Sequence, residues 1–169
     1  ATLAQSAVVV TARAMSVLKL ATAIRTASDK GDEDQLSKRL AEAQAAGDIK
    51  FRHALDAQDD ETDMTALTLA VAAGHLGCVS ILLAAGANPN VAVEDAGHRT
   101  ALHFAAQEDL VDVVRVLVEA GAETTAESTA GTARDIAAER AKHWRLGGGN
   151  GEEDITACNE IVAILQGAR

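Results

Sequence analysis

The sequence of 169 residues contains no tyrosine, one tryptophan, two phenylalanines and one proline. Because β-sandwich cores favour aromatic and β-branched side chains, this shortage disfavours an all-β core. The single proline, Pro89, leaves long stretches of the chain free to be helical. Alanine is instead abundant, at 37 residues, and small side chains let helices pack closely. The composition therefore predicts stacked helices, and the length suits one ordinary domain.

Two cysteines, Cys78 and Cys158, are too few for a disulfide scaffold or a zinc site. We expect both to be small buried residues, and their scarcity fits a reducing, intracellular compartment. The net charge of −10 disfavours binding to the phosphate backbone of nucleic acids as the main activity. The sequence thus argues against a nucleic-acid partner, and no residue pattern in it indicates a cofactor.

Residues 1–28 carry a charge of +3 with no acidic residue, whereas the rest of the chain carries −13. We interpret residues 1–20 as an added N-terminal helical segment that covers the end of the domain. A segment that bears arginine and lacks acids is also typical of organelle-targeting peptides, so a targeting remnant and an expression artefact are the alternatives. The predicted location is accordingly the cytoplasm, with the chloroplast or mitochondrion as the alternative.

The stretch Met64–Val93 has thirty residues without Asp, Glu, Lys or Arg. A run of about 20 apolar residues would span a bilayer. Gly74 and His75 interrupt this run, and turn-forming residues around Pro89 end it. We therefore predict two short helices here and no membrane span.

An internal repeat organises the middle of the chain. Residues 65–87 align without a gap with residues 100–122, over twenty-three positions at an offset of 35. Thr65 and Thr100 stand where a hydroxyl caps the first helix of a unit. Gly74 permits a tight turn into a second helix, and Gly86 permits its left-handed end. Neither helix can bury its apolar face alone, so the units must stack.

These residues resemble the ankyrin repeat. Residues 100–106 read TALHFAA, similar to the T-P-L-H-x-A-A signature of that family, and residues 85–90 read AGANPN, similar to its closing loop. The resemblance implies an all-α ankyrin-repeat solenoid of about four helix-turn-helix units, two regular and two divergent. The expected domain covers residues 21–169, with units near residues 21–55, 63–95, 98–129 and 131–168.

Two segments do not fit the regular spacing. Residues 47–55 are interpreted as an insertion in the loop between the first two units, and residues 146–151 as a flexible insertion in the last unit. Alanine also replaces the usual proline at three signature positions, Ala66, Ala101 and Ala133. Losing proline loosens a loop somewhat.

No arrangement of residues predicts catalysis, so we expect a protein that is not an enzyme. The glycine-rich stretch 147–151 precedes three acids, which would repel phosphate. The family uses histidine for structure at the positions of His75 and His103. His98 and His103 could approach each other, but no third ligand is evident and no metal site is predicted.

The resemblance implies binding of another protein through the hairpin loops and the first helices. Val71 and Ala72 are expected on that first-helix surface. The candidate partner-binding residues are Asp59, Asp60, Glu61, Asp63, Glu94, Asp95, His98, Arg99, Phe104, Gln107, Glu108 and Trp144. The acids either steer a partner with a basic surface or keep an alanine-rich protein soluble. Phe104 is either a contact or part of the core, and Trp144 either anchors a partner or packs against the inserted loop or the last helix.

Two classes of function follow from this reading. The first is a protein-protein interaction module that acts as an adaptor or inhibitor and exists as a monomer. The alternative is a structural accessory subunit of a larger hetero-complex, which an organelle could house.

Overall fold

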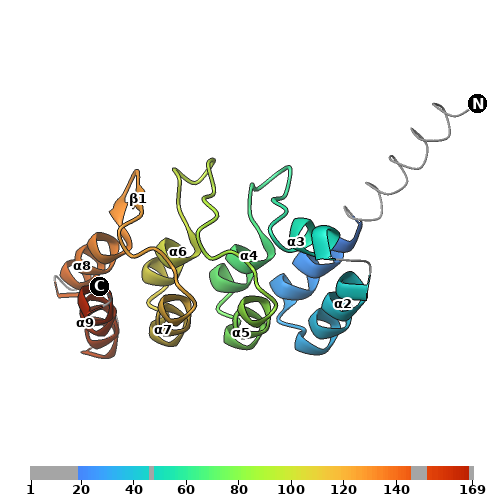
Figure 1. Cartoon of the computed structure of the whole chain (residues 1–169). Helices are drawn as coiled ribbons and strands as arrows, with labels where there is room; N and C mark the ends of the chain where they lie inside the picture. The colour runs from blue at the N-terminus through green and yellow to red at the C-terminus, as the bar shows by residue number, and fades with distance from the viewer. Residues whose placement is uncertain (1–18, 46–47, 146–151, 168–169) are drawn as a thin grey trace, which may run out of the picture.

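The computed structural model describes residues 19–45, 48–145 and 152–167, and within them the chain is a row of helix pairs (Figure 1). The first described helix covers residues 19–30. The later helices are α2 (Glu33–Ala45), α3 (Asp48–Leu55), α4 (Ala66–Ala72), α5 (Leu76–Ala84), α6 (Ala101–Gln107), α7 (Val111–Glu119), α8 (Ala133–His143) and α9 (Glu152–Gly167). Strands β1 (Glu127–Ser128) and β2 (Gly131–Thr132) form a small antiparallel hairpin. The predicted all-α solenoid is confirmed.

The helix pairs stack in sequence order. First helices contact first helices, α4 with α6 and α6 with α8, and second helices contact second helices, α2 with α5, α5 with α7 and α7 with α9. The apolar core runs through the whole row along these junctions. Its fully buried members include Leu36, Leu67, Leu82, Leu102, Leu117 and Ile161. Because each pair buries its apolar face only against its neighbours, the stability of the array resides in these junctions.

The first helices begin at the expected threonines. The backbone N–H of Thr68 donates to Thr65 Oγ1 at 3.2 Å. In the last unit Thr132 and Asp135 form a reciprocal capping box, with Asp135 N to Thr132 Oγ1 at 3.3 Å and Thr132 N to Asp135 Oδ2 at 3.0 Å. Gly74 and Gly86 have φ values of 73° and 91°, as the predicted turn and helix end require.

Two expectations about local structure are wrong. The insertion at residues 47–55 is not a loop over its described part, because residues 48–55 form helix α3. Ala54 and Leu55 are each 1% exposed, so this helix is anchored by burial in the core. Val71, expected on the partner-facing surface, is fully buried between helices. The predictions about residues 1–18 and 146–151 lie outside the described residues.

Candidate functional site: the hairpin loops and the first helices

Three hairpin loops project from the same edge of the stack, at residues 56–65, 85–100 and 120–132 (Figure 1). A side chain of one loop bonds to the backbone of the next loop at both junctions. Asp56 Oδ1 accepts the backbone N–H of Asn88 at 2.9 Å, and Asn90 Oδ1 accepts the backbone N–H of Glu123 at 2.8 Å. These bonds fix the spacing between neighbouring loops near their bases.

A second set of hydrogen bonds connects the loops nearer to their tips. Asp63 Oδ2 accepts the backbone N–H of Glu94 at 2.8 Å. Gln58 Nε2 donates to the carbonyl oxygens of Asp63 and Ala92, both at 2.9 Å. Between the second and third loops, the Thr129 N–H donates to the carbonyl of Gly97 at 3.0 Å. The three loops therefore form one connected surface.

Arg25, from the helix at residues 19–30, anchors the first loop through an ion pair and hydrogen bonds. Its side chain is only 7% exposed, pairs with Asp59 at 3.1 Å, and donates to the carbonyl oxygens of Ala57 and Gln58 at 3.3 and 3.2 Å. Asp59 Oδ1 also accepts the N–H of Glu61 at 3.0 Å. That N–H, and then the Arg25 guanidinium, hold the pKa of Asp59 below its ordinary value. Asp59 thus fixes the shape of the loop.

Arg25, Thr68 and His103 occupy the same position of successive first helices. Arg25 reaches the next loop, whereas the hydroxyl of Thr68 turns back to the carbonyl of Thr65 at 2.9 Å. Gln58 supplies the missing connection from the loop side, since it bonds the carbonyl of Ala92. Where Thr68 stands in place of the histidine of the next unit, the connection to the next loop is therefore made by Gln58.

The two histidines expected to be structural both lie against backbone groups. His75 Nε2 is 3.1 Å from the carbonyl oxygen of Asp29, in the turn of the preceding pair. His103 is 1% exposed, and its Nδ1 accepts the backbone N–H of Thr100 at 3.1 Å. Burial lowers the pKa of His103, while the backbone of Ala126 and Gly131 in the next loop acts in the opposite direction. The ring is therefore neutral at pH 7.

The predicted acidic residues divide into two groups. The side chains of Asp59 and Asp63 are used inside the loop surface. By contrast, four acids at the loop tips are exposed, and no salt bridge forms between any of them and a described lysine, arginine or histidine. These are Asp60, Glu61, Glu94 and Asp95. Exposed like charges at a fixed spacing add their fields, so the loop tips carry a negative potential.

On the adjoining first helix, Phe104 is 8% exposed, so its ring belongs to the core. Gln107 lies at the end of the same helix, where its amide accepts from Arg99 and donates to Glu108 Oε1 at 3.2 Å. His98 is exposed, with φ at 61°. The loop base and the helix end thus present a polar row made of Arg99, Gln107 and Glu108, with Phe104 supporting it from inside.

Trp144 lies away from the loop tips, at the end of α8. Arg140 lies over its ring, with the guanidinium carbon 5.2 Å from the ring centroid. The indole Nε1 donates to Asp109 Oδ2 at 3.4 Å, across to the preceding helix pair. The side chain is half-buried, and these contacts join it to α8 and to the preceding helix pair; the inserted loop against which it was expected to pack lies outside the described residues.

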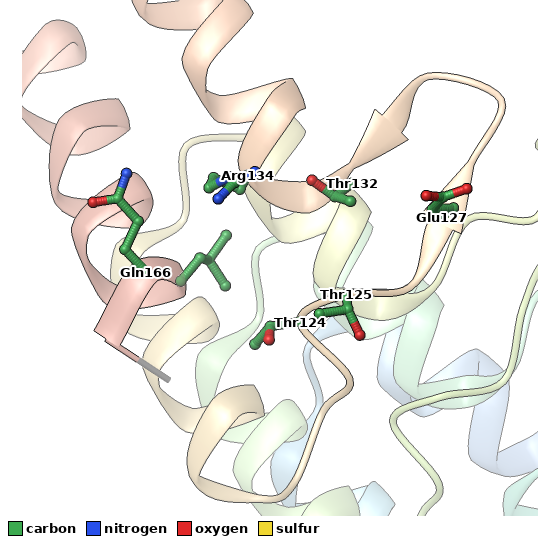
Figure 2. A pocket seen from close by; sticks show the side chains of 7 residues that line it. Thr124, Thr125, Glu127, Thr132, Arg134 and Gln166 are labelled. Atoms are coloured by element: carbon green, nitrogen blue, oxygen red, sulfur yellow. The ribbon is translucent and has the colours of Figure 1, made fainter. Parts of the chain in front are cut away.

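A separate hollow of about 350 Å³ lies at the C-terminal end of the stack, between the third loop, α8 and α9 (Figure 2). Its walls are formed by Thr124, Thr125, Glu127, Thr132, Arg134, Leu165 and Gln166. None of the twelve candidate residues named from the sequence lines it, although Glu127 belongs to the third hairpin loop. Within residues 19–45, 48–145 and 152–167, no group of three His, Cys, Asp or Glu side chains is placed to hold a metal ion.

Comparison with known families agrees with this geometry. A family model described as ankyrin repeats (3 copies) matches residues 22–128, which is more than half of the chain. The chain therefore belongs to the ankyrin repeat family, whose members are generally non-enzymatic protein-protein interaction modules. A search of curated proteins gives no match. The match ends before α8, yet α8 and α9 continue the stack as a fourth helix pair. Among the described helices, none is both long enough and apolar enough to cross a membrane.

Proposed function

We propose that this protein binds a partner protein through its hairpin loops and the polar row at the ends of the first helices, and that it has no catalytic activity. The observation that supports this most is the row of loops held in register by side chain to backbone hydrogen bonds, with exposed carboxylates at the tips. A surface that is already ordered before binding loses little conformational entropy on association.

The charge of the surface indicates the chemistry of the partner. The four exposed acids, Asp60, Glu61, Glu94 and Asp95, come from two neighbouring loops. Their combined field attracts a partner with lysine or arginine side chains and raises the rate of encounter. Arg99, from the same loop as Glu94 and Asp95, bonds to Gln107, and both side chains carry donors for polar groups of the same partner. A basic protein surface therefore fits best.

The test compares two charge-reversal variants of the same size. In the first, Asp60 and Glu61 become lysine; in the control, the exposed acids Asp112 and Glu119 on α7 become lysine. Tagged wild type and both variants are used for quantitative capture from native extract. A partner of the loop surface is lost with the first variant and kept with the control.

Kinetics on the captured partner then test the mechanism. Charge at the rim of an interface acts mainly on association, so the loop variant is expected to associate more slowly with little change in dissociation rate. Wild-type affinity should also fall as salt rises, since screening shortens to about 8 Å at physiological ionic strength. If the control variant loses the partner and the loop variant keeps it, attachment is through the second helices, and the accessory-subunit function is favoured instead.

A further inference from the structure

Asp109 occupies an unusual backbone position. In the repeat alignment at an offset of 35, it stands where the preceding unit has Gly74. The two residues have the same conformation, with φ at 57° for Asp109 and 73° for Gly74. A Cβ atom disfavours this left-handed region, which is why glycine is usual there. Aspartate at this turn therefore carries the free-energy cost of a Cβ at positive φ, and the contacts of its side chain offset that cost.

Those contacts all come from the fourth helix pair. Arg140 Nε donates to Asp109 Oδ1 at 2.8 Å, and Arg140 Nη2 donates to Asp109 Oδ2, which gives a bidentate ion pair. Trp144 Nε1 donates to Oδ2 at 3.4 Å. Cys158 Sγ, on α9, donates to Oδ1 at 3.0 Å. One carboxylate in the third unit is therefore bonded by both helices of the fourth.

Burial strengthens this cluster. The side chains of Asp109 and Arg140 are 14% and 31% exposed, and Cys158 is fully buried. Bidentate, charge-assisted hydrogen bonds are among the stronger hydrogen bonds in proteins, and partial exclusion of water reduces their electrostatic screening. Although burial opposes it, the bonds from Arg140 and Cys158 hold the pKa of Asp109 below its ordinary value. The carboxylate stays charged and its donors stay attached.

The junction differs from the one before it. At the corresponding turn within the second unit, between α4 and α5, Gly74 offers no side chain, and the second and third units are connected by loop contacts of Gln58 and Asp63. Between the third unit and α8–α9, the polar contacts on the face opposite the loops include those of Asp109 and an exposed ion pair, Arg115 with Glu160 at 2.7 Å. Among the described residues, Asp109 is thus a largely buried polar connection of the last junction.

We propose that Asp109 is a clasp that holds the fourth helix pair, α8 and α9, closed on the third unit, and that this pair opens as a unit when the clasp is broken while the preceding units stay folded. Arrays of this kind open at their ends because a terminal unit has one neighbour only. The clasp makes that opening dependent on a single side chain.

The two cysteines of the chain report such opening separately. Cys158 donates to Asp109, whereas Cys78 is buried on α5 in the second unit. Burial and then Asp109 raise the pKa of the Cys158 thiol to about 12, so the closed form reacts very slowly with alkylating agents. Alkylation of Cys158 therefore measures opening of the fourth pair, and alkylation of Cys78 measures unfolding of the array.

The experiment treats the full chain with iodoacetamide under native conditions and follows each cysteine by mass spectrometry. The variants are Asp109→Gly, which suits the left-handed backbone, and Asp109→Asn, which tolerates it and keeps the volume. Asp112→Asn, at an exposed acid in the first turn of α7, is the control. We expect alkylation of Cys158 to rise at least tenfold in both Asp109 variants, with Cys78 unchanged and the control like wild type.

Hydrogen exchange on the same proteins separates opening from a change in the thiol itself, because removing a neighbouring charge also lowers the thiol pKa. Faster exchange confined to α8 and α9 supports the clasp. The proposal is overturned if Cys158 reacts faster without faster amide exchange in those helices, if Cys78 and Cys158 accelerate together, or if neither rate changes. Should Asp109→Gly fail to fold, Asp109→Asn carries the same comparison, and Arg140→Gln on the other side of the clasp is expected to reproduce it.

Discussion

Asp63 and His98 occupy the same place in consecutive hairpin loops, two residues before the threonine that caps the next helix, and both have left-handed backbones with φ at 55° and 61°. Only Asp63 uses its side chain between loops, because its carboxylate accepts the N–H of Glu94. In the described part of the chain, the side chain of His98 forms no hydrogen bond or ion pair. The same backbone cost is therefore compensated in one loop and uncompensated in the other.

The first prediction follows from this pair. His98→Gly should raise the free energy of unfolding by about 0.5–1 kcal/mol, since glycine adopts a positive φ without a Cβ penalty. Asp63→Gly relieves the same backbone cost but removes a hydrogen bond worth about 0.5–1.5 kcal/mol, so it should give no gain. Urea denaturation of both variants measures the difference. Equal stabilisation by the two would show that the Asp63 bond contributes nothing.

The second prediction concerns the junction between units. Leu82 is fully buried between neighbouring second helices, so Leu82→Ala should lower the free energy of unfolding by about 2–5 kcal/mol through the cavity it leaves. Leu76 lies on the same helix but is 38% exposed, and Leu76→Ala should cost less than about 1 kcal/mol. Thermal and denaturant unfolding compare the two. A similar loss for both would mean that α5 does not pack as described.

The third prediction addresses the turn at Gly74. A Cβ at this position would meet only Leu110 Cδ2, at 3.9 Å, so space is available and the cost of a substitution lies in the backbone at φ 73°. Gly74→Val should therefore destabilise by about 1–3 kcal/mol. Gly74→Asn, with a side chain that tolerates this conformation, should cost clearly less. If the two variants melt at the same temperature, backbone strain is not the cause.

The fourth prediction concerns pH. Burial, with a smaller effect of Arg99 in the same direction, lowers the pKa of His103 from its ordinary 6.5. Below pH 6.5 the His103 ring therefore binds a proton in the unfolded chain more readily than in the folded chain. The stability associated with this ring is present above that pH and declines as the pH falls toward the lowered pKa.

Melting temperatures of wild type and His103→Gln, measured between about pH 7.5 and 5, test this sign. Wild type should lose stability across the interval, and His103→Gln, although less stable at the upper end, should lose less. The gap between the two proteins is thus expected to narrow on acidification. A gap that stays constant or widens would contradict a neutral, buried ring.

Much of the fold could be predicted because the signals are local. Thr65 and Thr100 mark helix starts, and the 35-residue offset carries the turn at Gly74 and the helix end at Gly86 into the next unit. The sequence does not predict helix α3, because the break in the repeat is interpreted as a loop. Its apolar residues, Phe51, Ala54 and Leu55, have helical spacing and were the available signal.

The roles of individual acids could not be predicted, because they depend on residues far along the chain. Asp59, unlike the neighbouring Asp60, pairs with Arg25, thirty-four positions earlier. The partners of Asp109 lie 31 to 49 residues later, in a unit that repeats the pattern only weakly. One sequence signal did exist: an aspartate aligned with Gly74 at a turn that favours glycine.

The loop-to-loop hydrogen bonds join residues only 31 to 34 positions apart, one unit to the next. Because each of these bonds spans a single junction, a tensile load along the described row of units must pass through the junctions one after another. Extension should then proceed in discrete steps from whichever junction yields first, and the remaining units should stay intact and recoil when the load is released. The array would therefore lengthen and shorten elastically, one helix pair at a time.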